Sequence, residues 1–318
     1  MIRYLFIVTL VSGILLTEDA SARLFWEMQP HEVRDLINEK ALAILAERPE
    51  VRNVNDITIT HCERTTSLRI YAPEKSENLP IILLIHGGAW VAGNLDTHDN
   101  MARYLCREVE ALVVSIGYLN APEAKFPLPL EQCYDTLLWI AEHAQEFHAD
   151  ATRLAVVGDS AGGNMAAALC LLVRDRKGPT IDLQVLINPA PDLTGNGTIQ
   201  RQNDGLDLIR WYATQYVADP NDVNSPYVSP IMAKDLTNLP SAVIILAEKD
   251  DLRRDGQRYA DRLISAGIPT NVYIQWGIEH LAGNGARASS VARESLGVGV
   301  AALRGVFLKK TPHQELCS

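Results

Sequence analysis

Short apolar runs recur along the chain, and helical stretches separate most of them. The run at 81–85 is continuous, which is typical of a strand buried on both faces. Similar runs are found at 112–116, 154–157, 185–187, 243–246 and 272–274. Residues with helical periodicity lie at 129–147, 161–175, 255–266 and about 287–308. Strands that alternate with helices predict an α/β fold, with a mostly parallel sheet covered by helices on both faces.

Two regions depart from this alternation. The stretch 30–47 reads as an amphipathic helix that begins near a proline, and two β-like segments follow at 57–60 and 67–71. The stretch 197–230 interrupts the order of strands and helices. It carries apolar residues at helical spacing, and we interpret it as an insertion over the edge of the sheet. The apolar positions of this insertion are Leu206, Ile209, Ala213 and Tyr216.

The first 22 residues have the pattern of an export signal. Arg3 precedes an apolar stretch at 4–16, and Ala20-Ser21-Ala22 is a small-residue cleavage pattern. The stretch is shorter than the about 20 residues that a transmembrane helix needs. We therefore expect cleavage after Ala22, export to the periplasm or the medium, no stable membrane anchor, and a single domain over 23–318. The alternatives are a short uncleaved anchor or a buried N-terminal segment.

The composition is that of a globular chain, with 47% hydrophobic and 21% charged residues among 318. The net charge of −10 disfavours nucleic acid as a partner. The five cysteines include no C-x-x-C pair, which excludes the usual zinc and thioredoxin-like spacings. We expect no metal and no cofactor, and we expect Cys106, Cys133 and Cys170 to be buried apolar residues. The composition predicts neither the oligomeric state nor any disulfide pairing.

The strongest chemical signal is Gly158-Asp159-Ser160-Ala161-Gly162. It follows the apolar run 154–157 and precedes an alanine-rich helix. This order of strand, turn and helix is the context of a nucleophile elbow, whose tight turn leaves no room for side chains beside the serine. The helix start also directs free N–H groups toward developing negative charge. The sequence therefore predicts Ser160 as a nucleophile.

A second motif, His86-Gly87-Gly88-Ala89-Trp90, directly follows the buried run 81–85. A histidine and glycines at a strand end are typical of the oxyanion-hole loop of esterases and lipases. We expect the N–H groups of Gly87, Gly88 and Ala161 to form the oxyanion hole. His86 itself is expected to shape the loop by hydrogen bonding and not to act as a base.

The base follows by elimination, because the acid and then the histidine come after the nucleophile in this fold. Only His280 and His313 follow Ser160, and His313 lies in a polar tail. His280 follows the last strand-like segment and is the predicted base. The acid should follow the run 243–246, where the candidates are Glu248, Asp250, Asp251 and Asp255. Asp255 is more easily explained as a helix-start residue. Spacing alone does not choose among the other three.

These motifs together resemble the hormone-sensitive-lipase-like (family IV) carboxylesterases, over nearly all of residues 30–310. The resemblance also rests on the following motifs: Tyr118 with Ala121-Pro122-Glu123, Phe126-Pro127 with Pro129-Leu130-Glu131, Ser225-Pro226-Tyr227-Val228-Ser229-Pro230, and Ala247-Glu248-Lys249-Asp250 with Leu252-Arg253. It implies an α/β-hydrolase fold with Ser160 as nucleophile, Asp250 as triad acid and His280 as base. It also implies a small helical cap formed by about 23–50 and 197–225.

Some positions depart from the family pattern. Ala89 replaces a commoner glycine, Asp251 stands where proline usually follows the acid, and Leu281-Ala282 replaces the usual Gly-Phe after the histidine. The last change affects the expected pocket wall. We expect Leu281, together with Trp211 and Tyr212 of the insertion, to contact the substrate.

The sequence thus predicts a serine carboxylesterase that hydrolyses short- to medium-chain esters through an acyl-enzyme. One alternative is amide hydrolysis by the same triad. Another is a non-catalytic ligand-binding protein, as in gibberellin receptors, which are similar to this family but have lost the catalytic histidine. The presence of Ser160, Asp250 and His280 argues against that second alternative.

Overall fold

A computed structural model describes residues 28–43, 48–75, 77–195, 203–280 and 290–309. Its centre is an eight-stranded sheet with the order β1-β2-β4-β3-β5-β6-β7-β8. The strands are β1 Asn53–His61, β2 Arg64–Ala72, β3 Leu79–Ile85, β4 Leu112–Gly117, β5 Ala149–Asp159, β6 Leu183–Ile187, β7 Ser241–Ala247 and β8 Thr270–Gln275. Only the pairs β1–β2 and β2–β4 are antiparallel. The predicted α/β fold with a mostly parallel sheet is therefore confirmed.

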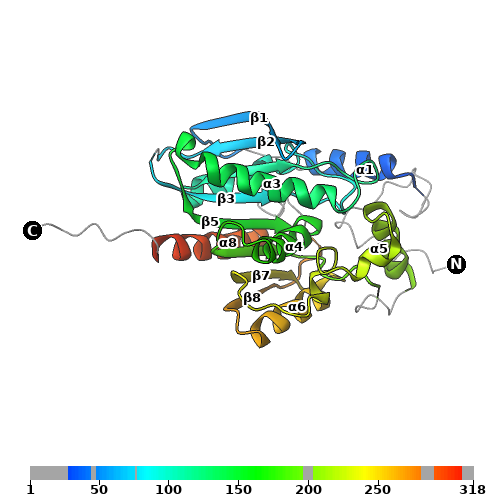
Figure 1. Ribbon diagram of the computed structural model, residues 1–318. Coiled ribbons are helices and arrows are strands. Elements are labelled where there is room, and N and C mark those ends of the chain that lie inside the picture. Colours follow the sequence, from blue (N-terminus) through cyan, green and yellow to red (C-terminus); the bar gives the residue numbers. More distant parts are fainter. Residues whose placement is uncertain (1–27, 44–47, 76, 196–202, 281–289, 310–318) are drawn as a thin grey trace, which may run out of the picture.

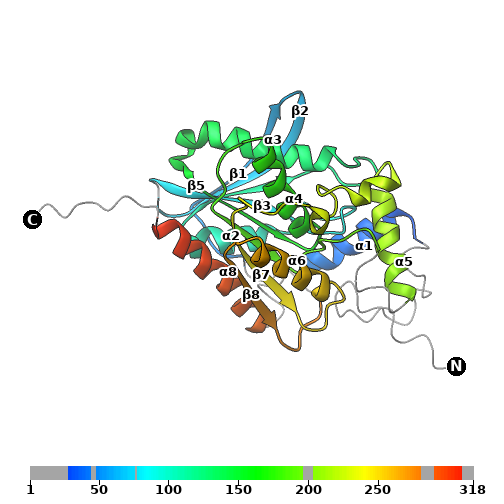
Figure 2. The ribbon, with the colours of Figure 1, turned by 60° about the horizontal axis from the view of Figure 1, so that its bottom comes forward.

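Helices cover both faces of this sheet (Figures 1 and 2). Their bounds are α1 Pro30–Ala43, α2 Asp99–Val109, α3 Leu128–His143, α4 Ala161–Asp175, α5 Asn203–Tyr216, α6 Arg253–Ser265 and α8 Ser290–Lys309. Short 3₁₀ helices are η3 Ala144–Phe147, η5 Pro220–Asn224 and η6 Pro230–Met232. Most of these elements begin and end within a few residues of the predicted bounds.

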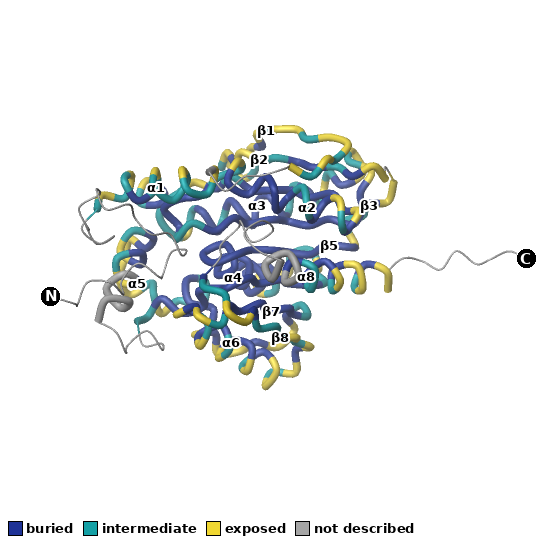
Figure 3. The backbone as a smooth tube through the Cα atoms, turned by 180° about the vertical axis from the view of Figure 1, so that it is seen from behind, coloured by how far each residue is buried: buried dark blue, intermediate teal, exposed yellow. Residues whose placement is uncertain are grey.

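The two faces of the sheet form two separate apolar cores. Along β3, Ile81, Leu83 and Ile85 join the core beneath α3, α4 and α6, whereas Ile82 and Leu84 join the core beneath α2 and α8. This alternation follows from the period of two along a strand. Because both faces are covered, all seven residues of β3 are buried, and dark blue strands fill the middle of Figure 3. The continuous apolar runs of the sequence are explained by this double burial.

Helix α2 is absent from the elements that the sequence predicted. Its buried side includes Met101, Leu105 and Val109, which are spaced four residues apart. Its first turn, however, carries the polar residues Asp99 and Asn100. Both polar residues are also buried, and Asp99 accepts a hydrogen bond from Tyr71. The sequence did not reveal this helix because its first turn is polar. The burial of that turn depends on Tyr71, which lies 28 residues away.

Helices α1 and α5 lie at the same end of the molecule (Figures 1 and 2). Arg34 of α1 donates to the carbonyl oxygens of Val91 and Ala121. Lys125 donates to the carbonyl oxygens of Thr214 and Val217 at the C-terminal end of α5, where a cation is favourable. These contacts attach both helices to loops of the sheet. The division into one domain with a cap from 23–50 and 197–225 stays a prediction.

Cys106, Cys133 and Cys170 are buried free thiols, as predicted, and Cys62 is an exposed free thiol. The predicted export signal at 1–22 lies outside the described residues. Among the helices that the structure describes, none is both long and apolar enough to cross a membrane.

Candidate active site

Ser160 occupies the turn between β5 and α4, with φ 53° and ψ −118°. A positive φ is strained for a residue with a side chain, and such strain is concentrated at functional sites. The turn is possible because its neighbours are glycines. A Cβ on Gly158 would lie 2.3 Å from the carbonyl oxygen of Gly162, and one on Gly162 would lie 2.1 Å from that of Ile85. The Ser160 N–H donates to the Ile187 oxygen at 2.8 Å, which fixes the elbow to β6.

His280 lies between Ser160 and Asp250. Its Nε2 is 3.0 Å from Ser160 Oγ, and its Nδ1 is 2.6 Å from Asp250 Oδ2. A carboxylate only accepts hydrogen bonds, so Nδ1 carries a proton and the neutral ring leaves Nε2 free to accept one from the serine. All three side chains are buried. The structure therefore brings together the three residues that the sequence predicted as a triad.

The structure also separates the four candidate acids. Asp250 follows β7, and its second oxygen, Oδ1, accepts from the Leu252 N–H at 2.9 Å. Asp251 is exposed, Glu248 accepts from the Gly277 N–H at 2.6 Å, and Asp255 pairs with Arg258 at 3.1 Å. Of these four acids, only Asp250 is hydrogen-bonded to His280.

The surroundings of His280 raise its pKa. Burial alone lowers the pKa because it disfavours the imidazolium, but the charge and hydrogen bond of Asp250 outweigh it. The negative charges of Asp159 and Asp251 act in the same direction as Asp250. The pKa of His280 therefore lies above its ordinary value of 6.5. A base of this kind accepts a proton more readily than a free imidazole does.

The oxyanion loop differs from the prediction at one position. The Gly87 N–H donates to Asp159 Oδ1 at 3.0 Å, so it is not free to bind an oxyanion. The prediction for Gly87 is wrong because the sequence does not show that a buried carboxylate already takes this donor. Within the described residues, the N–H groups of Gly88, Ala89 and Ala161 have no hydrogen-bond acceptor. These three amides are the candidates for the oxyanion hole.

His86 is fully buried and shapes this loop. Its Nδ1 lies 2.9 Å from the Gly87 carbonyl oxygen, and its ring stacks on Tyr118 at 4.0 Å. Burial, and then the positive charge of His98, lower the pKa of His86 to about 3. The ring is therefore neutral at physiological pH, which agrees with the predicted role in the loop.

The predicted pocket residues have different environments. Tyr212 is buried in the main core, with 4% of its surface exposed, and Trp211 is partly buried against the same core. Their rings make an edge contact at 5.3 Å. Leu281 lies outside the described residues. Whether these three residues contact the substrate stays a prediction.

Two side chains beside the elbow and the oxyanion loop were not predicted from the sequence to belong to the site. Tyr216 of α5 stacks on Trp90, the last residue of the loop motif, at 5.2 Å. His98 lies 3.0 Å from Asp159, the residue before the nucleophile. The available signals were the position of Asp159 inside the elbow motif and the position of His98 shortly after the loop. Neither position indicates its partner.

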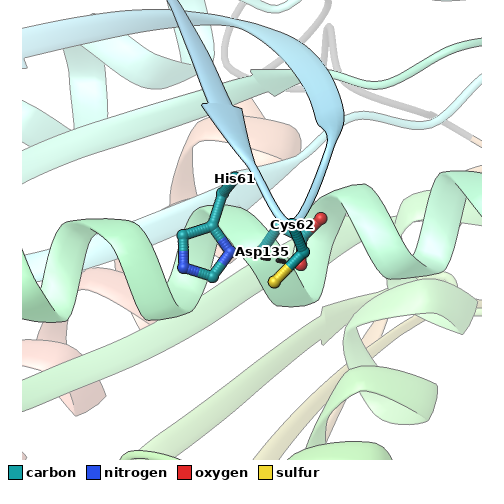
Figure 4. Close-up of side chains that lie close together, drawn as sticks. All are labelled: His61, Cys62 and Asp135. Carbon is teal, nitrogen blue, oxygen red and sulfur yellow. Dashed lines mark ion pairs between the residues drawn. The ribbon is translucent and has the colours of Figure 1, made fainter.

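A second cluster of ligand-type side chains lies elsewhere, where the β1–β2 hairpin meets α3 (Figure 4). His61, Cys62 and Asp135 place their possible ligand atoms within 4.8 Å of one another. Both oxygens of Asp135 already accept from the Arg64 guanidinium, at 2.5 and 2.8 Å. This cation neutralises the carboxylate that a metal ion would need, so we interpret the cluster as an ion pair that anchors the hairpin. The expectation of no metal or cofactor stays a prediction.

Comparisons with known proteins agree with this geometry. Residues 82–282 match the family model described as the alpha/beta hydrolase fold. An arylesterase of Saccharolobus solfataricus is 36% identical over 252 residues, which cover 77% of this chain and 82% of the relative. The carboxylesterase NlhH of Mycobacterium tuberculosis is 36% identical over 247 residues, which cover 74% of this chain and 77% of the relative.

A further relative and a solved structure extend the similarity. An ethyl acetate hydrolase of Pseudomonas putida is 31% identical over 263 residues, which cover 80% of this chain and 83% of the relative. The crystal structure of a Pyrobaculum calidifontis esterase superimposes with a TM-score of 0.83 at 36% identity. That superposition covers 88% of this chain and 94% of the esterase.

Proposed function

We propose that this member of the α/β-hydrolase-fold family hydrolyses short- to medium-chain esters through an acyl-enzyme on Ser160. Within that family the chain belongs to the hormone-sensitive-lipase-like carboxylic ester hydrolases. The observation that carries the proposal is the continuous hydrogen-bonded chain from Ser160 through His280 to Asp250. Because these residues come from three separate loops, their meeting is a property of the fold and not of a local motif.

In the first step, Ser160 Oγ attacks the ester carbonyl carbon while His280 Nε2 takes the hydroxyl proton. Asp250 keeps its charge, holds Nδ1 protonated and stabilises the imidazolium. His280 then gives its proton to the leaving alcohol oxygen, and the acyl group stays on Ser160. In the second half, His280 takes a proton from water while the water oxygen attacks the acyl carbon. His280 then gives this proton to Ser160 Oγ as the acyl–oxygen bond breaks and the acid is released.

Negative charge develops on the carbonyl oxygen in both halves. The amides of Gly88 and Ala89 in the oxyanion loop and of Ala161 in the elbow support this step, because none of them has an acceptor among the described residues. One such donor typically contributes about 3–4 kcal/mol to the transition state. The fixed loop and the start of α4 supply these donors without reorganisation.

Two measurements test the proposal. The rate on nitrophenyl esters of rising acyl length is expected to be highest for short and medium chains. A fluorophosphonate probe is expected to label the wild-type protein at Ser160, since only an activated serine reacts. The Ser160→Ala variant is the control for the label. Failure of the folded wild-type protein to label, or to turn over any of the esters, would refute the proposal.

A further inference from the structure

A second acid–histidine pair includes Asp159, the residue directly before the nucleophile. Asp159 is fully buried, His98 is 4% exposed, and His98 Nε2 lies 3.0 Å from Asp159 Oδ1. The same Oδ1 accepts from the Gly87 N–H at 3.0 Å. One carboxylate oxygen thus joins a histidine to the oxyanion loop.

His98 is held by contacts at both ring nitrogens. Its Nδ1 lies 2.9 Å from Thr97 Oγ1, whose hydroxyl also contacts the Asn94 carbonyl oxygen at 2.8 Å. Its Nε2 lies 3.0 Å from Asp159 Oδ1, and the Gly87 N–H is directed at the same nitrogen at 3.3 Å. His98 and Asp159 therefore both contact the Gly87 amide.

We propose that His98 and Asp159 are positioning residues of the esterase site, which hold Gly87 so that the next two amides, Gly88 and Ala89, point at the oxyanion. This inference rests on the proposed function. Asp159 is bonded to the nucleophile Ser160 through the peptide and to the oxyanion loop through its side chain. A single residue therefore fixes the distance between the attacking oxygen and the oxyanion donors.

The close approach at Gly87 supports this role. A Cβ at this position would lie 2.5 Å from Asp159 Oδ2 and 2.8 Å from the Asp159 carbonyl oxygen. These distances are shorter than any normal contact, so the loop packs on Asp159 at a distance that only glycine permits. A misplacement of about 1 Å in such a site costs about 10²-fold in rate.

The charge of Asp159 needs compensation because a bare carboxylate near the oxyanion would oppose it. Burial raises the pKa of Asp159, but the charge of His98, its hydrogen bond and the Gly87 N–H outweigh burial and hold this pKa below its ordinary value. The carboxylate is therefore ionised, and the contacts with His98 and the Gly87 N–H compensate its burial. His86 also faces Asp159 but is neutral. The ionised carboxylate thus remains an acceptor that can hold the Gly87 amide.

The first experiment measures kcat and KM of Asp159→Ala, Asp159→Asn and His98→Gln on a short nitrophenyl ester. Asp159→Ala is expected to lower kcat about 10²-fold with little change in KM, because the loop loses its anchor. Asp159→Asn is expected to lose less, since its amide oxygen can still accept from Gly87. Asp135→Asn is the matched control, because Asp135 is also a buried carboxylate in an ion pair but belongs to the hairpin anchor of Figure 4. It should lower the thermal stability and leave kcat unchanged.

The second experiment measures the pH at which kcat/KM falls on the acid side. Asp250, Asp251 and Asp159 all raise the pKa of His280. Asp159→Asn removes one of these charges, so the acid limb is expected to move to lower pH. His98→Gln keeps the charge of Asp159, so the limb is not expected to move to lower pH. A residue with a merely structural role would leave the limb in place.

The results separate the possible outcomes. Wild-type kcat in a folded Asp159→Ala, or an unmoved acid limb in Asp159→Asn, overturns this inference while the proposed function stands. If Asp159→Ala does not fold, the acid limb of kcat/KM in the isosteric variant Asp159→Asn tests the inference instead. Full activity of Ser160→Ala instead refutes the proposed function itself.

Discussion

Two buried acid–histidine pairs flank Ser160, and they consist of the same residue types. In Asp250–His280 the histidine reaches the serine hydroxyl, at 3.0 Å, and the acid faces away from it. In His98–Asp159 the pair contacts no nucleophile; instead the Gly87 N–H donates to the acid at 3.0 Å and points at His98 Nε2 at 3.3 Å. The third group that each pair contacts therefore decides what the pair can do. A histidine facing a hydroxyl can move a proton, whereas a carboxylate facing an amide can only hold it.

The contacts of the two histidines differ in the same way. His280 donates to one acceptor and faces a hydroxyl that can give it a proton, so its neutral form is useful. His98 instead contacts Thr97 Oγ1 through Nδ1, and Asp159 and the Gly87 N–H through Nε2. The first ring faces the hydroxyl that is proposed to react, and the second faces the amide of the loop.

The first prediction removes the group that both pairs serve. Ser160→Ala is expected to lower turnover about 10⁶-fold while the fold stays intact, as in other triads. Steady-state kinetics on a nitrophenyl ester and thermal denaturation measure the two quantities. Retention of more than about one percent of the activity would contradict the role of Ser160, given the size of this effect.

The second prediction concerns the acid of the first pair. Asp250→Asn is expected to lower kcat about 10⁴-fold, because the amide favours the wrong tautomer of His280. The loss should exceed that of Asp159→Ala by about 10²-fold, since losing proton transfer costs more than misplacing a donor. Asp251→Asn is the control, because Asp251 is exposed and lies one residue away. Equal losses at 250 and 251 would contradict the assignment of the acid.

The two pairs were not equally accessible from the sequence. The strands of the parallel part of the sheet were predictable because each contains a continuous apolar run. His280 followed from the order of residues in the fold, since only one other histidine follows Ser160. Asp250 needed the family resemblance, because spacing alone left several acids open. In each case a local pattern or a known order carried the information.

The second pair had no such pattern. His98 and Asp159 are 61 residues apart, and their contact depends on how α2 and β5 pack, which no local period encodes. The error at Gly87 has the same origin, because the acceptor of its N–H lies 72 residues away. A backbone N–H that belongs to an oxyanion-loop motif can already donate to a buried residue from another strand.

The third prediction uses the pKa of His280 to sharpen the comparison. The ring must be neutral to accept the serine proton, so activity falls as pH drops through its pKa. Asp250 and its neighbours raise this pKa above 6.5, and the acid limb of kcat/KM should therefore lie at higher pH than for an ordinary histidine. The profile should have the slope of a single proton, because His280 is the one ring that contacts the Ser160 hydroxyl. A limb below pH 6 would show that burial outweighs Asp250, in contrast to the raised pKa.

The last and smallest effect is expected at Glu248. Like Asp159, this carboxylate accepts a hydrogen bond from a glycine amide, but its hydrogen bond is exposed to solvent. Its Oε2 accepts from the Gly277 N–H at 2.6 Å, and Gly277 lies three residues before His280. A carboxylate thus holds a backbone amide beside each of the two histidine sites, but this one faces water. A hydrogen bond in such a place contributes about 1 kcal/mol, because water replaces a lost partner easily. Glu248→Gln removes the charge but keeps an oxygen that can accept from Gly277, so it is expected to lower kcat by no more than about threefold.

The pH profile separates the two carboxylates further. Glu248 is not among the charges that raise the pKa of His280, so Glu248→Gln should leave the acid limb unchanged while Asp159→Asn moves it. Lys249→Ala is the control for the segment, because Lys249 is exposed and adjacent to Glu248. If Glu248→Gln cost as much as Asp159→Ala, burial would not explain the difference between the two contacts. The role of Asp159 would then be a general property of any carboxylate that binds a loop amide near the site.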